Sequence, residues 1–410
     1  MRHRAYARLW VAAFVSNIGT WMESIALGIY VVQLTHQAVW AGAVAGAAFL
    51  PIAFFGPIGG ALADRFPRKW LLMGTTLAQT GLATLLTVLF ATGSPSAPVV
   101  TLIALGNGIA AALGFPAFQA LLPDLVPTED LPGAIALSSA QFNLGRVVGP
   151  ALAGVVISIG GYAWAEGANA ASFLAVVAVL LTLTLPLPAA GARDERLVRS
   201  IIEGFGLVRR ERGLRITAIA MCLNTLLAAP FIALVPAMAR DVFHNGKFGT
   251  AVLVTAQGIG AVAIALSLGG LVARWGPRRV LVTMMGALPI ALIAYAFAPS
   301  LALSALALLL VGGVYLGALS TFTTIAQLRA PAAIRGRVVS VYIVILGALY
   351  PLGAIIQGKI ADTIGLRETT AGAAVLMAAV MLITRAVRPG VTGAISQPVE
   401  LPDAALAVVE

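Results

Sequence analysis

The residues of this chain best suited to chemistry are two ionisable side chains that lie inside long apolar stretches. Glu23 comes fourteen residues after Leu9, and Arg146 thirteen after Gly133, so each lies about 20 Å along a helix. A charge inside a membrane is costly and therefore marks a candidate functional site. A carboxyl group can bind and release a proton, whereas an Arg side chain keeps its charge.

Three interpretations of Glu23 and Arg146 follow from the sequence. The two side chains form a buried structural pair, or Glu23 carries a proton while Arg146 is its partner or a substrate contact. In the third interpretation Glu23 lies near the outer interface and does neither. The polar residues expected beside them in a cavity are Asn17, which shares a span with Glu23, and Asn143, one turn from Arg146.

Motifs for covalent chemistry are missing from the sequence. It has no Walker loop, no G-x-S-x-G and no H-E-x-x-H. The three His residues, His3, His36 and His244, lie at the N-terminus or near expected outer loops and cannot form one metal site. We therefore expect no enzyme, no metal site and no cofactor. A membrane-embedded enzyme is the competing class, and flux in proteoliposomes would separate a transporter from a binding protein without transport.

Composition places the chain in a membrane. Hydrophobic residues make up 60% and charged residues 10%, against about 25% charged in soluble domains. No Asp, Glu, Lys or Arg occurs from Trp70 to Pro123 or from Val280 to Leu328, and each stretch is long enough for two spans. Continuous apolar runs exclude a β-barrel. They predict twelve transmembrane helices, at 9–34, 40–63, 70–92, 98–123, 133–159, 164–186, 214–240, 248–273, 280–297, 301–327, 338–361 and 369–386.

The basic residues are distributed unevenly over the loops of this topology. With the N-terminus inside, most of the 26 Lys and Arg lie on the cytoplasmic side. The positive-inside rule then predicts that both termini are cytoplasmic, in a multi-pass protein of the cell inner (plasma) membrane. The net charge of +10 is thus a topology signal. Nucleic-acid binding is disfavoured, because the bases are spread over separate loops.

The polar segment 187–213 divides the chain into two halves of six spans each. We expect an N-terminal bundle over 1–186, a C-terminal bundle over 214–388 and a flexible cytoplasmic tail over 389–410. Segment 187–213 itself contains apolar residues spaced like one helix face, which predicts a surface helix in a cytoplasmic linker.

The two halves also repeat each other in sequence. "GGALADRFPRK" at 59–69 has a counterpart in "GGLVARWGPRR" at 269–279, where Arg274 replaces Asp64. "LVPTEDLPGAIALS" before the fifth span resembles "RAPAAIRGRVVSVY" before the eleventh. Duplicated halves of this kind place a binding site at their interface.

These motifs resemble a known family. "GGALADRFPRK" matches the G-x-L-A-D-R-x-x-R-K loop between spans two and three of the major facilitator superfamily. "GRVVGPALAG" is similar to the G-P-x-x-G element of its exporters, with Gly149, Pro150 and Gly154. "YARLWVAAFVSNIGTWMESIALG", "FPAFQALLPDLVPTEDLPGAIAL" and "RGRVVSVYIVILGALYPLGAIIQG" resemble the bacterial drug, macrolide and siderophore exporters of the transmembrane secretion effector type. The resemblance covers about residues 5 to 388.

The resemblance implies an all-α membrane protein with two pseudo-symmetric six-helix bundles that transports by alternating access. We expect a monomer in membrane lipids that exports hydrophobic or amphiphilic small molecules, such as drugs, macrolides or siderophores. Proton antiport would drive it, with Glu23 as the proton carrier and the proton gradient in place of any cofactor. The alternative is a facilitator or symporter for a small metabolite or lysolipid.

The repeated basic loops suggest a conformational switch. Pseudo-symmetry would place the loop after span two opposite the start of span eleven, so that Asp64 meets Arg335, Arg337 and the positive end of a helix dipole. Arg274 would meet the loop holding Asp124, Glu129 and Asp130. Both contacts would close the cytoplasmic side and favour the outward-open state. The switch set is Gly60, Asp64, Arg65, Arg68, Lys69, Arg274, Arg278, Arg335 and Arg337.

Overall fold

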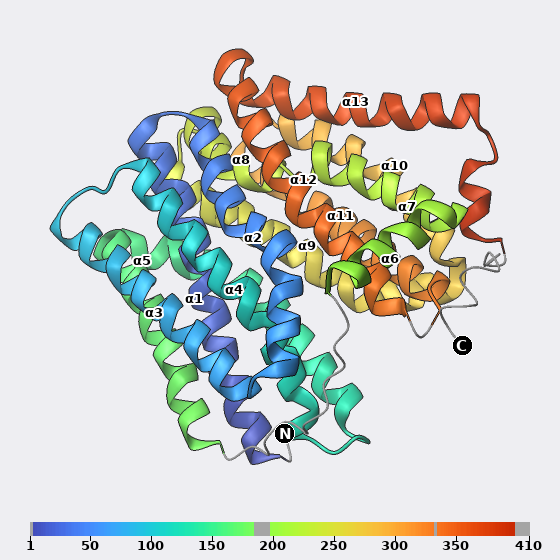
Figure 1. The fold of residues 1–410 in the computed structure, drawn as a ribbon. Coiled ribbons are helices and arrows are strands. Elements are labelled where there is room, and N and C mark those ends of the chain that lie inside the picture. Colours follow the sequence, from blue (N-terminus) through green and yellow to red (C-terminus); the bar gives the residue numbers. More distant parts are fainter. Residues whose placement is uncertain (1–2, 184–196, 332–333, 398–410) are drawn as a thin grey trace.

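The computed structural model describes residues 3–183, 197–331 and 334–397, and every regular element in these ranges is a helix (Figure 1). The first half of the chain contains α1 (Arg4–Thr35), α2 (Ala38–Arg65), α3 (Arg68–Thr92), α4 (Ala97–Leu125) and α5 (Leu131–Thr182). The linker contains α6 (Leu197–Arg210). The second half contains α7 (Arg212–Leu223), η1 (Asn224–Ala228), α8 (Phe231–Ala237), η2 (Met238–Val242), α9 (Gly246–Trp275), α10 (Pro277–Ala296), α11 (Leu301–Arg329), α12 (Arg335–Ile364), α13 (Leu366–Val387) and η4 (Val391–Ile395).

The predicted all-α fold with twelve spans is confirmed. Ten helices of the described chain are long and apolar enough to cross a membrane. One of these ten is the 52-residue α5, which turns at Gly161 and so supplies two spans. The remaining span is α1, whose 32 residues include Glu23. The turn in α5 requires glycine, because Gly161 has φ 73°, a conformation that side chains disfavour.

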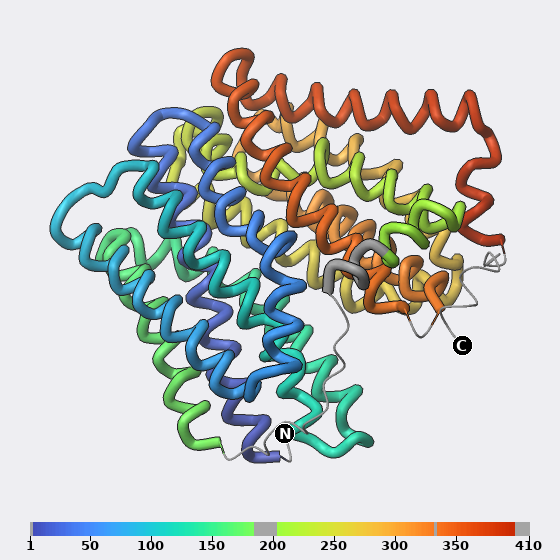
Figure 2. The backbone as a smooth tube through the Cα atoms, viewed as in Figure 1, coloured from blue at the N-terminus to red at the C-terminus, as the bar shows by residue number. Residues whose placement is uncertain are grey.

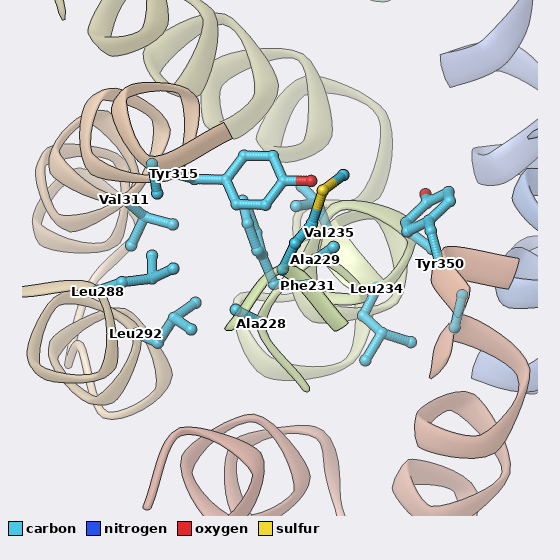
Figure 3. Packing of buried hydrophobic residues seen from close by; sticks show 14 of the residues in the cluster. Ala228, Ala229, Phe231, Leu234, Val235, Leu288, Leu292, Val311, Tyr315 and Tyr350 are labelled. Atoms are coloured by element: carbon cyan, nitrogen blue, oxygen red, sulfur yellow. The ribbon is translucent and has the colours of Figure 1, made fainter. Parts of the chain in front are cut away.

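The seventh predicted span, 214–240, is an interrupted helix rather than a regular one. It runs through α7, the π-helical turns η1 and η2, and α8. Pro230 and Pro236 lie within it, and a proline removes a backbone donor and disturbs the preceding turn. Residues of the segment are nevertheless buried in a hydrophobic core. In Figure 3, Ala228, Phe231 and Leu234 lie in the middle, with Leu288 and Val311 on one side and Tyr350 on the other.

The two halves meet at one side of the molecule and diverge toward the other, as Figures 1 and 2 show. We call the side with the N-terminus and the α2–α3 turn the terminal side. The far side holds the α1–α2 turn at His36 and the α12–α13 turn at Gly365. The most extensive contacts between the halves are those of α2 with α12 and of α5 with α9. A molecule of this shape is closed on the far side.

Small residues let the helices of the two halves approach closely. Gly42 of α2 lies against the backbone carbonyl of Ala354 in α12, so that a Cβ atom there would overlap it. In the second contact, a Cβ on Gly258 of α9 would come within 3.2 Å of the Arg146 carbonyl oxygen in α5. Close backbone approach of this kind favours association of helices in lipid, where no hydrophobic driving force acts between them.

Helix α6 lies within segment 187–213 and packs on the start of α12. Glu203 of α6 forms an ion pair with Arg337, and Gly204 lies against the Arg337 backbone. Residues 187–196 of the predicted linker lie outside the described residues.

The tail differs from the flexible segment expected over 389–410. Its first residues form η4, and Ala394 and Ile395 are buried. The reason is Arg329 at the end of α11, which donates to the carbonyl oxygens of Ile395 at 2.8 Å and Gln397 at 2.9 Å. Residues 398–410 lie outside the described ranges.

Arg329 also forms a buried ion pair with Glu211, which caps α7 through the Leu214 amide. Burial would raise the pKa of Glu211, but hydrogen bonds from Arg329 and from backbone amides outweigh it and lower the pKa below its ordinary value. The pair therefore stabilises the protein at neutral pH, and this contribution is lost as the pH falls through the lowered pKa. Linker, α11 and tail are thus joined at one charged centre.

We expect Arg329→Ala to destabilise the second half by about 3–5 kcal/mol, because it leaves the buried Glu211 charge without a partner. Thermal unfolding of the purified protein measures this, and limited proteolysis reports release of the tail. Arg329→Met combined with Glu211→Met removes both charges and should recover much of the loss. An Arg329→Ala protein as stable as the exposed control Arg279→Ala would contradict the assignment.

Candidate functional site

Glu23 lies in a polar pocket inside the first half. The side chain is 6% exposed. Asn107 of α4 donates its amide to Glu23 Oε1 at 2.6 Å, and Asn169 of α5 donates to Glu23 Oε2. Three helices therefore converge on one carboxyl group, and both of its oxygens accept a hydrogen bond.

Arg146 lies where the two halves meet. It belongs to the first arm of α5 and is 9% exposed. Its guanidinium is 5.6 Å from the centre of the Trp21 ring on α1. Tyr315 of α11 and Tyr350 of α12 lie in its neighbourhood. A permanent positive charge thus lies among aromatic residues from both halves.

The structure does not bring Glu23 and Arg146 together as a pair. Within the described part of the chain, no ion pair joins them, and no carboxylate lies within salt-bridge distance of Arg146. The reason is the helix itself: Trp21 and Glu23 are two residues apart on α1 and so point to opposite faces. Arg146 contacts the Trp21 face, whereas Glu23 points into the first half.

The other predicted cavity residues lie on the Arg146 side of α1. Asn17 is one turn before Trp21, and a Cβ on Gly145 would lie 3.1 Å from its Cβ atom. Asn143 is partly exposed and donates to the Ser139 carbonyl of its own helix at 2.8 Å. Asn17, Asn143 and Arg146 therefore share one region, and Glu23 is separated from it by the thickness of α1.

The exporter element in α5 connects the two halves. A Cβ on Gly149 would lie 2.9 Å from the Ile18 carbonyl oxygen of α1, and Pro150 follows it as a buried residue inside the helix. A Cβ on Gly154 would lie 2.7 Å from the Ala251 Cβ in α9. One glycine thus allows α5 to pack on α1, and the next allows it to pack on the opposite half.

The family can be assigned from comparison with known proteins. The profile of the transmembrane secretion effector family, a branch of the major facilitator superfamily, matches residues 1–407. The chain belongs to this transporter family. It is a multi-pass membrane transporter and not an enzyme.

Relatives and solved structures agree with this assignment. The macrolide efflux protein A of Streptococcus pyogenes is 26% identical over 88% of this chain and 90% of its own. The enterobactin exporter EntS of Shigella boydii is 30% identical over 82% and 80%. Among solved structures, a bacterial homologue of the human lysosomal transporter Spinster has a TM-score of 0.76 at 14% identity, covering 97% of this chain and 99% of its own. This last likeness concerns the fold.

The switch residues of this secretion effector lie on the terminal side, where the halves are apart. Asp64, Arg274 and Arg335 are exposed, and a Cβ on Gly60 would meet no atom within 4 Å. Arg65 is exposed as well. Arg278 donates to the Thr392 hydroxyl at 3.2 Å and so holds the tail. The expected contact of Asp64 with Arg335 is therefore not made in this conformation.

Other bases of the repeated loop bind within their own half. Arg68 forms an ion pair with Asp124 at 2.9 Å and donates to the Ala120 carbonyl. Lys69 donates to the Leu183 carbonyl at 2.6 Å. Asp124 was expected opposite Arg274, but α3 begins and α4 ends on the same side of one bundle, which makes Arg68 its neighbour. Arg337 binds Glu203 of the linker helix.

Two contacts on the far side were not predicted from the sequence. Asp362 at the end of α12 accepts hydrogen bonds from the Ala38 amide at 2.5 Å and the Val39 amide at 3.2 Å, and so caps α2 across the two halves. Arg240 of η2 donates to the Val32 carbonyl near the end of α1. The negative Asp362 lies at the positive N-terminal end of α2, and the positive Arg240 lies near the negative C-terminal end of α1. Both arrangements are favoured by the helix dipole. We call these two contacts the far-side caps.

We expect Asp362→Ala to weaken far-side closure. Loss of a helix N-cap costs about 1 kcal/mol, a factor of about five in the ratio of two conformations. Spin labels at the exposed Ala91 and Pro299, one in each half, report the distance across the far side, with Cys222 replaced by Ser. The distance distribution should shift to longer values. Glu368→Ala, an exposed acid on α13, is the control, and an unchanged distribution for Asp362→Ala would rule out the cap as a closing contact.

Proposed function

We propose that this secretion effector exports hydrophobic or amphiphilic small molecules in exchange for protons. The observation that carries the proposal is the aromatic site around Arg146, which draws residues from both halves. A site built at such an interface changes shape when the halves rock, as alternating access requires. Similarity to a macrolide efflux protein and an enterobactin exporter supports the direction of transport.

The surroundings of Arg146 favour a particular kind of substrate. Trp21 packs edge-on against Phe142 at 5.8 Å, and Tyr350 against Phe49 at 5.2 Å. These rings offer apolar faces, while the guanidinium offers donors and a charge that no described carboxylate neutralises. An amphiphilic molecule with a negative or hydrogen-bond-accepting group, such as a macrolide or a siderophore, complements both features.

Orientation and energy source complete the proposal. We place the terminal side in the cytoplasm of the inner membrane, because basic residues concentrate there. The structure then corresponds to a state open to the cytoplasm, ready to take up substrate. Glu23 serves as the proton carrier, and substrate and proton shift the two conformations through their different affinities for each. The protein works as a monomer surrounded by lipid.

Export is tested with cells that express the protein. Accumulation of a macrolide, a siderophore and a cationic dye is measured with and without a protonophore. We expect lower accumulation of at least one amphiphile, reversed by the protonophore. Uptake that rises with expression, or transport that ignores the protonophore, would instead favour the alternative, a symporter or facilitator for a small metabolite or lysolipid.

A further inference from the structure

Glu166 is a second buried acid in the first half. It has no part in the substrate site around Arg146 or in the proton-carrier role proposed for Glu23. It lies on the second arm of α5 and is fully buried. Neither of its carboxyl oxygens has a hydrogen-bond partner in the described structure. A buried carboxylate without any donor is strongly disfavoured, whereas the neutral acid is tolerated there.

Glu166 lies beside Glu23. It is one helical turn before Asn169, whose amide binds Glu23, and residues three apart share a helix face. The two carboxyl groups are close enough to interact electrostatically. Further along α5, Ala170 and Phe173 pack with Ala83 of α3 in a buried hydrophobic cluster.

Few other ionisable groups face this pocket. α3 and α4 contribute no charged residue over their apolar stretch, and α4 offers only the Asn107 amide. The tyrosines Tyr30 on α1 and Tyr162 on α5 lie toward the far side, and Lys247 of α9 lies over the Tyr162 ring. Arg146 is on the other face of α1. No base of the described chain forms an ion pair with either acid.

We propose that Glu23 and Glu166 form a single proton-binding site inside the first half, in which the two carboxyl groups together carry one proton. Two negative charges in one buried pocket repel each other, so the pair retains one proton to avoid carrying both charges. The environments divide the roles. Glu23 receives two amide donors, which suit a carboxylate, and Glu166 receives none, which suits the protonated acid.

This site lies on the opposite face of α1 from the aromatic site around Arg146. Proton and substrate then do not compete for one position, and α1 transmits the effect of one to the other. Loss of the proton leaves two charges that push α1 away from the second arm of α5. Close packing makes this effective: a Cβ on Gly19 would lie only 2.6 Å from the Ser172 hydroxyl. Movement of α1 carries Trp21 with it and alters the contact with Arg146.

The inference rests on proton coupling in the proposed function, but its test needs no transport. Infrared spectroscopy of the purified full-length protein in lipid detects the C=O stretch of a protonated carboxyl group, identified by its shift in D2O. At neutral pH we expect one buried protonated carboxyl in the wild type. Glu166→Gln should remove this signal, because Glu23 is then left alone with two donors. Glu23→Gln should retain the signal, which then arises from the protonated carboxyl group of Glu166.

Further variants and outcomes make the test decisive. Glu166→Met, which has a similar shape and no polar group, repeats the expected loss if Glu166→Gln folds poorly. Glu368→Gln is the control and should retain the signal. No signal in the wild type, or a signal that survives both Glu166→Gln and Glu166→Met, overturns the shared site. Transport that ignores a protonophore, with the infrared result intact, would instead overturn the proposed antiport and leave the proton site standing.

Discussion

Glu23→Gln is expected to abolish export against a gradient while leaving downhill exchange of a neutral substrate largely intact. The substitution mimics the protonated acid permanently, so the two conformations can no longer differ in proton affinity. Glu166, which no longer has a second charge beside it, keeps its proton, so a pH gradient drives no proton exchange. Substrate should therefore equilibrate across the membrane and not accumulate.

The fold should survive this substitution. One Asn donor keeps its acceptor on the carbonyl oxygen of the substituted side chain, and the new amide can donate to Asn107 Oδ1, which has no partner in the described structure. Everted vesicles with an imposed pH gradient measure accumulation of the macrolide probe, and counterflow without a gradient measures exchange. Glu368→Gln is the matched control. Protonophore-sensitive accumulation by Glu23→Gln at the wild-type level would remove Glu23 from the mechanism.

The architecture of this protein follows closely from its sequence, because the membrane imposes simple rules. Apolar runs and the break near Gly161 predict the spans, since a backbone in lipid must satisfy its own hydrogen bonds as helix. In the structure, α6 lies in the chain between α1–α5 and α7–α13. What the sequence could not show is which way a side chain points once helices pack.

Glu23 and Glu166 illustrate this limit. Depth alone suggested that Glu23 faces Arg146, but the helix places Trp21 there instead. The predicted span 164–186 begins two residues before Glu166, and the sequence alone does not show that this side chain is buried inside the first half. The spacing of Glu166 and Asn169, three residues apart on one apolar helix, was the signal that could have identified it.

The far-side caps show a second limit. In the sequence, Asp362 and Arg240 look like ordinary charged residues at the ends of spans. Only the packing of α12 on α2 and of η2 on α1 gives these two side chains their partners. Contacts between the halves also differ from one conformation of a transporter to the next. The sequence must be compatible with at least two such conformations. We expect the terminal-side contacts of Asp64 to form in the conformation that is closed on the terminal side.

Asp64→Asn is therefore expected to shift the protein further toward the state open on the terminal side and to lower export. Asp64 ends α2 as an exposed acid, and Arg335 begins α12 as an exposed base. When the halves close on this side, pseudo-symmetry brings Asp64 to the positive end of α12. A carboxylate at such a position stabilises the closed state by about 1 kcal/mol, which changes the ratio of the states about fivefold.

Spin labels at the exposed Thr128 and Arg385 measure the distance across the terminal side in the Cys222→Ser background. Asp64→Asn should deplete the short-distance population, whereas Asp362→Ala, which weakens the opposite side, should enrich it. These opposite responses distinguish two competing gates from a general loss of stability. A short-distance population unchanged by Asp64→Asn would contradict the role of Asp64.

The reversed charge of the second repeat allows a test by charge exchange. Arg274 takes the place of Asp64 in the repeated motif, and its expected partner is the acidic α4–α5 loop, in which Glu129 is exposed. Arg274→Asp alone should lower export because two acids then face each other when the terminal side closes. Adding Glu129→Arg supplies an opposite charge and should recover part of the lost rate. Since Asp124 is already bound by Arg68, recovery must come through the loop itself, and a double variant no better than Arg274→Asp alone would show that the pairing is wrong.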